Sequence, residues 1–154
     1  MLIEVLIAVL IFSMGILGIV GLQASAVKAS TDAKYRSEAG LLANELIGRM
    51  WVSDRSQATL QTAFSSPGGV AYTAWAWEGS TSGTSATPAP GTVLQTLPGT
   101  QANPPVVVIT PVPSPVGSTS PPGSLVTITI FWKMPSEPDS AASHNYVTVA
   151  QIGG

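Results

Sequence analysis

The stretch that decides the fold is residues 1–27, MLIEVLIAVLIFSMGILGIVGLQASAV. It is apolar almost throughout, and its one charged side chain is Glu4. A helix needs roughly 20 apolar residues to cross a bilayer, and Val5 to Val27 supplies such a run without a charge. Because a carboxylate inside a membrane helix costs about 2.5 kcal/mol or more, we expect Glu4 to pair with a cation from another chain or with an N-terminal amine.

The composition of the whole chain limits the number of domains and the kinds of function that it can have. Its 154 residues suffice for one small domain, or for one domain with a tail. Only 9% of the residues are charged, the net charge is −2, and Lys and Arg form no cluster, so direct binding of nucleic acid is not expected. The lack of cysteine excludes a disulfide framework, a thiolate nucleophile and a cysteine-based metal site.

Helix-forming residues continue to about Leu60, and the first proline is Pro67. Within the apolar stretch, three glycines recur at a spacing of three, namely Gly15, Gly18 and Gly21. Each costs roughly 1 kcal/mol relative to Ala in an aqueous helix, whereas small residues let helices approach closely in a membrane. These glycines are therefore expected to mark where the helix packs closely or loosens.

Polarity changes at Lys28, and residues 28–64 are expected to be the amphipathic half of the same helix. Apolar side chains at three–four spacing define one face, namely Tyr35, Ala39, Leu42, Ala43, Leu46, Ile47 and Met50. Glu45 and Arg49 lie off this face, in the i,i+4 order that favours an ion pair. The Ser, Pro and Gly residues at 65–69 are expected to end the helix.

Residues 70–78, VAYTAWAWE, are rich in aromatic and β-branched side chains and predict a strand. At a period of two, Trp75 and Trp77 would share one face, packed on the helix as core, and Tyr72 would lie on the other. Residues 79–123 are rich in Pro, Ser and Thr and predict a long surface loop that is functional, disordered or O-glycosylated. Within it, VVVIT at 106–110 predicts an edge strand, because nearby prolines forbid a central one.

Residues 124–152 predict an antiparallel hairpin that closes the chain. Its strands are LVTITIFWK at 125–133 and NYVTVAQI at 145–152. The predicted fold class is therefore α+β, with one long N-terminal helix and a small antiparallel sheet on its C-terminal half. Residues 1–27 form the membrane-compatible half of this helix and residues 28–154 form a head. The predicted core of the head is Leu42, Leu46, Met50, Trp75, Trp77, Ile128, Ile130 and Trp132.

The residues that could carry chemistry are few. His144 is the only histidine, and it lies near Ser143, Asp139 and Glu137. Catalytic triads depend on fold geometry rather than on closeness in sequence, and these residues have no recognised metal-ligand spacing. The sequence also contains neither a phosphate-binding loop nor a dinucleotide-binding motif. We therefore expect neither an enzyme nor a cofactor or metal site.

Several stretches resemble a known family. They are LIEVLIAVLIF at 2–12, GILGIVGLQASAVKAS at 15–30, YRSEAGLLANELIGRM at 35–50, TITIFW at 127–132 and HNYVTVAQI at 144–152. The first is similar to the N-terminus of type IV pilin-like proteins, and the others resemble the PilV-type minor pilins. The resemblance is specific over the first helix, looser over the hairpin and absent from residues 79–123.

The resemblance implies a start that differs slightly from the one seen here. Mature type IV pilins begin with a methylated residue and carry Glu at the fifth position, after a prepilin peptidase has removed a short leader. In this chain the acidic residue is Glu4. We therefore expect the chain to begin one residue inside the mature protein, or at an internal Met.

The resemblance also implies partners and a location. A pilin would wait in the bacterial inner membrane with its head in the periplasm, and would then enter an extracellular pilus that serves adhesion or twitching motility. Its partners would be other major and minor pilins, the inner-membrane assembly machinery and a tip adhesin. Glu4 would meet a neighbour's N-terminal ammonium, and this contact with Leu2, Ile3 and Val5 beside it would set subunit register.

Three other functions remain open from the sequence. A pseudopilin of a type II secretion system shares the same N-terminal features. A major, filament-forming pilin is also possible, and abundance in purified filaments would decide between the two. A plain membrane-anchored binding domain would use the loop at residues 79–123 and would show neither filament association nor dependence on a peptidase.

Overall fold

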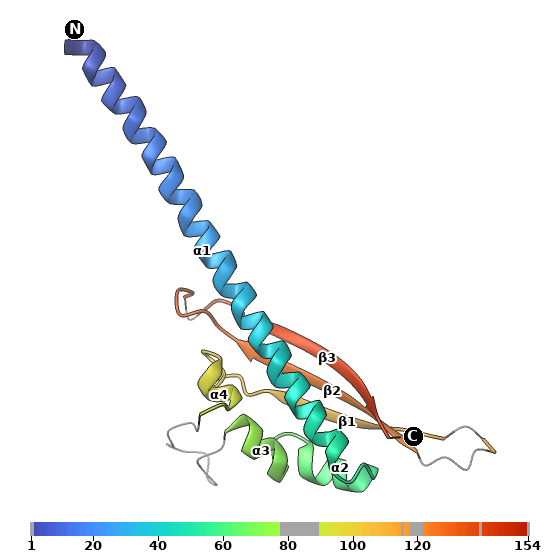
Figure 1. Ribbon diagram of the computed structural model, residues 1–154. Helices are drawn as coiled ribbons and strands as arrows, with labels where there is room; N and C mark the ends of the chain where they lie inside the picture. The colour runs from blue at the N-terminus through green and yellow to red at the C-terminus, as the bar shows by residue number, and fades with distance from the viewer. Residues whose placement is uncertain (1, 78–89, 115, 118–121, 139, 154) are drawn as a thin grey trace. The chain divides into compact units, whose positions relative to one another are not determined.

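The computed structural model describes residues 2–77, 90–114, 116–117, 122–138 and 140–153. Its first helix, α1, runs without interruption from Leu2 to Val52 (Figure 1). The chain divides into two compact units, residues 1–34 and residues 35–154. The first unit consists of the N-terminal part of α1. The second unit is the head, and it begins seven residues later than the change of polarity at Lys28 suggests.

The head has the predicted α+β architecture. The C-terminal part of α1 packs against a three-stranded antiparallel sheet of order β1-β2-β3. Among the described residues, three short helices complete the head (Figure 1). In chain order, the remaining elements are α2 (Gln57–Phe64), α3 (Val70–Ala76), α4 (Val93–Thr96), β1 (Val106–Val112), β2 (Gly123–Trp132) and β3 (His144–Ile152).

The sheet confirms both strand predictions made for the C-terminal part of the chain. The predicted hairpin is β2 and β3, which pair from Ser124↔Ile152 to Trp132↔His144. The predicted edge strand is β1, and it extends past residue 110 to Val112. Pro111 is tolerated within β1 because an edge strand needs ladder hydrogen bonds on one side only.

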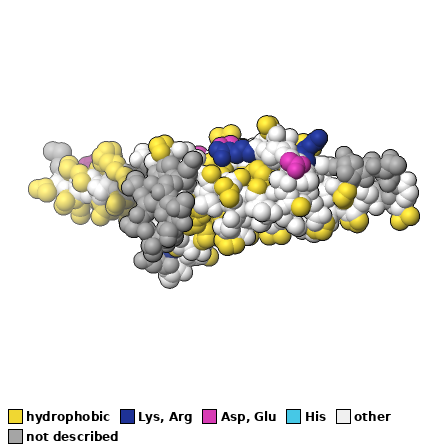
Figure 2. All heavy atoms as spheres, turned by 90° about the horizontal axis from the view of Figure 1, so that it is seen from below, with side chains coloured by type: hydrophobic (Ala, Val, Ile, Leu, Met, Phe, Trp, Pro, Cys, Tyr) yellow, Lys and Arg dark blue, Asp and Glu magenta, His cyan; other side chains and the backbone are white. Residues whose placement is uncertain are grey.

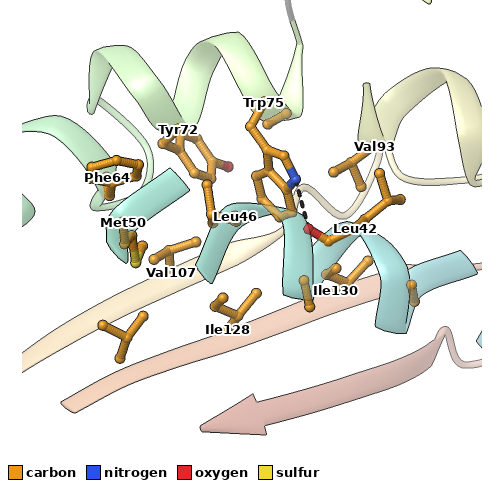
Figure 3. Packing of buried hydrophobic residues seen from close by; sticks show 14 of the residues in the cluster. Leu42, Leu46, Met50, Phe64, Tyr72, Trp75, Val93, Val107, Ile128 and Ile130 are labelled. Atoms are coloured by element: carbon orange, nitrogen blue, oxygen red, sulfur yellow. Dashed lines mark hydrogen bonds between the residues drawn. The ribbon is translucent and has the colours of Figure 1, made fainter. Parts of the chain in front are cut away.

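The core of the head joins α1, α3 and the sheet, whose side chains point toward one another in Figure 3. The predicted stripe of α1 is buried at Ala39, Leu42, Ala43, Leu46 and Met50, with Tyr35 and Ile47 partly buried against the cluster. All the predicted core residues are buried except Trp77, which is only partly buried and packs at the edge of the cluster. Most helical stability in proteins comes from such packing of an amphipathic face.

The first helix ends earlier than the sequence suggests. Instead of continuing to residue 64, α1 stops at Val52, and a separate helix α2 begins at Gln57. The cause is a cluster of short polar side chains. The Asp54 carboxylate accepts hydrogen bonds from the Ser56 backbone N–H and from the hydroxyls of Ser56 and Thr59, while Ser56 is the N-cap of α2. Side chains of this kind give the backbone an alternative to the helix.

The same contacts act on the charge of Asp54. The hydrogen bond from the Ser56 backbone, followed by those from the Thr59 and Ser56 hydroxyls, lowers the pKa of this carboxyl below its ordinary value. Hydrogen bonds donated to a carboxylate favour the charged form. The ionised carboxylate therefore stabilises the turn between α1 and α2.

The prediction of a strand at residues 70–78 is wrong. Val70–Ala76 is the helix α3, and Glu78 lies outside the described residues. Tyr72, Trp75 and Ala76 are separated by three and four positions, so the helix places all three in the core. Tyr72 consequently lies in the core with Trp75, and not on an opposite face.

Two hydrogen bonds fix α3 to its neighbours. The Trp75 indole Nε1 donates to the Leu42 carbonyl of α1 at 3.1 Å, as the dashed line in Figure 3 shows. The Tyr72 hydroxyl donates to the Pro105 carbonyl at 2.7 Å, just before β1. Burial also raises the pKa of the Tyr72 hydroxyl above its ordinary value.

The stretch predicted as a long loop, residues 79–123, contains the helix α4 and the strand β1. Its residues 79–89 lie outside the described part of the chain.

Candidate functional site

The main candidate site is the apolar segment, which we define as residues 2–27 of α1. Its large apolar side chains are exposed, from 46% at Ile16 to 81% at Leu2. Figure 2 shows hydrophobic side chains covering the visible part of this segment at the left. By length and composition, α1 is the one helix among the described residues that is able to cross a membrane. The charge-free run of residues 5–27 is about 34 Å long at the 1.5 Å rise of an α-helix, which matches a hydrocarbon core of roughly 30 Å.

Glu4 lies in the first turn of α1, among exposed apolar neighbours. Leu2, Ile3 and Val5 are each more than 60% exposed. A carboxylate in a first turn is favoured by the partial positive charge at the N-terminus of a helix. This local effect is worth less than 1 kcal/mol at typical exposed positions, so it offsets only part of the cost of placing the charge in an apolar environment.

The three glycines of the apolar segment meet no steric restriction from the described residues. The helix is continuous through Gly15, Gly18 and Gly21. Apart from the neighbouring backbone of α1 itself, a Cβ atom added at any of them would meet no described atom within 4 Å. Whether the helix loosens at these positions stays a prediction. If a steric need for glycine exists here, its cause is a neighbouring molecule.

Two hydroxyl groups of α1 donate to its own backbone. The Ser13 Oγ donates to the Val9 carbonyl at 2.7 Å, and the Thr31 Oγ1 donates to the Val27 carbonyl at 2.9 Å. Both bonds span four residues, the usual geometry for Ser and Thr in a helix. Since each unsatisfied polar group in a membrane costs several kcal/mol, the Ser13 bond suits the middle of the segment to an apolar environment.

The few residues able to carry chemistry lie at the loop between β2 and β3. The His144 Nε2 lies 3.0 Å from the Glu137 Oε2, and the imidazole ring stacks on Trp132 with 5.8 Å between ring centroids. The Ser143 hydroxyl accepts a hydrogen bond from the Asn103 amide at 3.0 Å. Asp139 lies outside the described residues. Within the described ranges, no group of three His, Cys, Asp or Glu side chains is placed to hold a metal ion.

A cavity of about 380 Å³ opens beside α4. Its lining consists of Tyr35 and residues 94–101, and no lysine, arginine, aspartate or glutamate is among them. The hydroxyls of Thr96 and Thr100 donate to backbone carbonyls of the same region. The described lining of the cavity therefore presents no group with an evident catalytic role.

A second exposed surface lies on the outer face of the sheet, the face turned away from α1. The strand register places Val106, Thr129 and Val147 in one row of this face. The next row consists of Val108, Thr127 and Val149. The four valines are between 39% and 56% exposed. The sequence did not single out this surface, because its existence depends on the order of strands in the sheet.

Comparison of the chain with models of known protein families, with curated proteins and with solved structures gave no match.

Proposed function

We propose that this chain is a minor pilin that takes part in the assembly of a type IV pilus. One observation carries the proposal: an exposed apolar segment with a single carboxylate near its end continues, in one helix, into the core of a folded head. A segment of this kind requires an apolar environment supplied by lipid or by other helices. The resemblance of residues 2–50 and of the hairpin to PilV-type minor pilins supports the same function.

The proposed mechanism uses the apolar segment in two successive environments. Before assembly the segment anchors the chain in the bacterial inner membrane, with the head in the periplasm. During assembly the segment leaves lipid and packs among the helices of neighbouring pilins in the filament. The Glu4 carboxylate then pairs with the N-terminal ammonium of a neighbour, because an unpaired buried charge is strongly disfavoured. This pairing fixes the axial register of the subunit.

The substitution Glu4→Gln tests this mechanism. It keeps the shape of the side chain and removes the charge, so insertion into the membrane is expected to stay normal. Removal of one partner from a buried ion pair costs about 3–5 kcal/mol, so the amount of the variant in sheared filaments is expected to fall at least tenfold. The matched control is Glu45→Gln, which removes an exposed carboxylate that pairs with Arg49 at 2.7 Å on the same helix. Normal incorporation of Glu4→Gln, or an equal loss in the control, contradicts the mechanism.

Mass spectrometry of the N-terminus in the same filaments tests the class of subunit. A leader-free, N-methylated start, recovered at low stoichiometry beside a major pilin, is the expected result. Dominance of this chain in the filament would make it the major subunit instead. An unprocessed chain found only in membranes would leave a plain anchored domain and overturn the proposal.

A further inference from the structure

The two edges of the sheet differ in how their backbone groups are satisfied. At the edge formed by β1, the Val107 N–H donates to the Ser66 Oγ at 3.0 Å, and the Val107 carbonyl accepts from the Ser66 N–H at 3.2 Å. The Gln61 side chain also reaches the Ile109 carbonyl at 3.4 Å. The residues between α2 and α3 therefore close this edge. Pro111 within β1 removes a further backbone donor.

Within the described ranges, the edge formed by β3 is open. β3 pairs with β2 on one side, and among the described residues no hydrogen bond joins the other side of residues 145–152 to any element. An edge strand directs every second N–H and C=O outward, so this edge presents a row of unpaired backbone groups. Natural proteins usually protect such an edge with proline, charged side chains or a covering segment. Residues 145–152, NYVTVAQI, contain neither proline nor a charged residue.

The surface beside the open edge is apolar and uncharged. Val147 and Val149 are 53% and 56% exposed on the outer face. They continue across Thr129 and Thr127 to the valines of β1, so the two rows contain no charged side chain. A strand added at this edge would bring its own side chains beside Val147 and Val149. Cross-strand pairs of β-branched residues stabilise a sheet by about 0.2–1 kcal/mol each, which favours an uncharged partner rich in Val, Thr or Ile.

A second copy of this chain does not fit the edge. Pairing of β3 with β1 of another copy is blocked by Ser66, Gln61 and Pro111. Antiparallel pairing of two β3 strands about a twofold axis perpendicular to the sheet would make the head portions of the two α1 helices, residues 35–52, run in opposite directions. Heads added to one filament in the proposed way have the same direction, so this step rests on the proposed function.

From these observations we propose that the open edge of β3 is a docking site for an uncharged, proline-free strand of a different protein, which extends the sheet to four strands. The interaction is β-augmentation, in which main-chain hydrogen bonds provide affinity and alternate side chains provide specificity. The docking site consists of the backbone of residues 145–152 together with the side chains of Val147 and Val149.

The test uses the full chain in detergent micelles and a defined probe, a synthetic peptide of nine alternating Thr and Val residues with a Lys at each end. Hydrogen exchange is measured at each backbone amide with and without the peptide, and affinity is measured by fluorescence anisotropy of the labelled peptide. The expected result is slower exchange at alternate amides of β3, with β1 unchanged. A peptide of the same sequence with alternate amides N-methylated is expected to bind at least tenfold more weakly.

The sheet provides a matched pair of variants, because Val149 and Val108 lie in the same row of the same face at opposite edges. They are similarly exposed, at 56% and 49%. Val149→Lys places a charge at the open edge and is expected to weaken peptide binding at least tenfold. Val108→Lys makes the same change at the closed edge and is expected to alter binding less than twofold. Equal effects of the two variants, absence of protection at β3, or protection of β1 instead would overturn the proposal.

A cysteine variant tests whether the strand that docks on β3 comes from a different protein or from a second copy of this chain. The chain has no cysteine, so Thr148→Cys introduces a single thiol in the middle of β3. In a twofold β3 pair centred on residue 148, the two thiols would meet and form a disulfide under mild oxidation. A product of twice the chain mass, formed more readily than with Val108→Cys, would identify a second copy and overturn the proposal. Because these assays need no filament, they are independent of the Glu4→Gln result.

Discussion

The substitution Leu46→Ala tests how α1 packs in the head. Leu46 is fully buried in the middle of the cluster, with side chains of α3 above it and of the sheet below it in the view of Figure 3. The change removes three carbon atoms, worth roughly 2.4 kcal/mol at about 0.8 kcal/mol per buried methylene. The cavity that remains adds a further cost, and measured Leu→Ala losses in cores span about 2.7–5.0 kcal/mol. We expect a loss of about 3–4 kcal/mol in the free energy of unfolding.

Leu41→Ala is the matched control. Leu41 precedes Leu46 on the same helix and is 67% exposed. The chemical change and the change in helix propensity are the same at both positions, so the difference between the variants isolates the effect of burial. An exposed substitution of this kind is expected to alter stability by less than about 0.5 kcal/mol.

The assay is urea-induced unfolding of the full chain in micelles, followed by near-ultraviolet circular dichroism. Trp75 and Trp132 are buried in the same core and report its loss. The apolar segment stays helical in the micelle, so the near-ultraviolet signal rather than the helical signal measures the head. A loss below about 1 kcal/mol for Leu46→Ala, or equal losses for the two variants, would refute the packing of α1 described above.

Three further predictions concern the head, all measured by urea unfolding. Tyr72→Phe removes the hydrogen bond to the Pro105 carbonyl and is expected to cost about 1–2 kcal/mol. Because the pKa of Tyr72 is raised in the folded state, its contribution to the free energy of unfolding is complete below the unfolded pKa of 10.0 and is lost as the pH rises through the folded pKa. The Phe variant is expected to lack this loss of stability at alkaline pH. The folded pKa of Asp54 is lowered, so its contribution is present above the unfolded value of 3.8 and is lost as the pH falls through the folded pKa. Asp54→Asn is expected to remove this loss of stability at low pH. If the variant loses stability at low pH as the wild type does, another group is responsible. Gly99 and Gly91 both have positive φ, but only at Gly99 would a Cβ lie within 3.0 Å of another atom. Gly91→Ala is therefore expected to lower the free energy of unfolding by about 1–2 kcal/mol through the backbone alone, and Gly99→Ala is expected to lower it more. A larger loss for Gly91→Ala than for Gly99→Ala would refute the close approach of Gly99 to Lys133.

The long elements of the fold were predictable because many residues repeat one pattern. The stripe on α1 follows helical spacing over residues 35–50, and the alternation of β2 leaves a single choice of buried face. The short segments were not predictable in the same way. In residues 70–77, Trp75 and Trp77 fit a period of two, whereas Tyr72, Trp75 and Ala76 fit the three–four spacing of a helix, and only tertiary packing decides between them.

The break between α1 and α2 had a signal in the sequence. Ser53, Asp54 and Ser56 form a group of residues that favour helix N-caps and turns, and Ser56 is the N-cap found in the structure. The helix-forming residues on both sides of the group concealed this signal. A search for capping residues within long helical patterns would have placed the break.

The two exposed surfaces differ in how far the sequence predicts them. The apolar segment follows directly from its composition, because a charge-free run of this length is typical of a helix that can span a bilayer. The open edge of β3 does not, because it depends on strand order and on the bonds between Ser66 and Val107, residues far apart in the sequence. The prolines around β1 predict that strand to be an edge, but they leave the position of β3 undetermined.

The hydrogen bonds within α1 have a thermodynamic consequence for transfer of the apolar segment between environments. Its backbone is hydrogen-bonded within the helix, and the Ser13 hydroxyl donates a hydrogen bond to the Val9 carbonyl. Lipid chains and apolar side chains are similar in polarity, so exchanging one environment for the other changes mainly van der Waals contacts. For a subunit of the proposed kind, the partition between membrane and filament is then nearly balanced over most of the segment. Glu4 carries the one acidic side chain of the segment, and its pairing in the filament would set the direction of transfer.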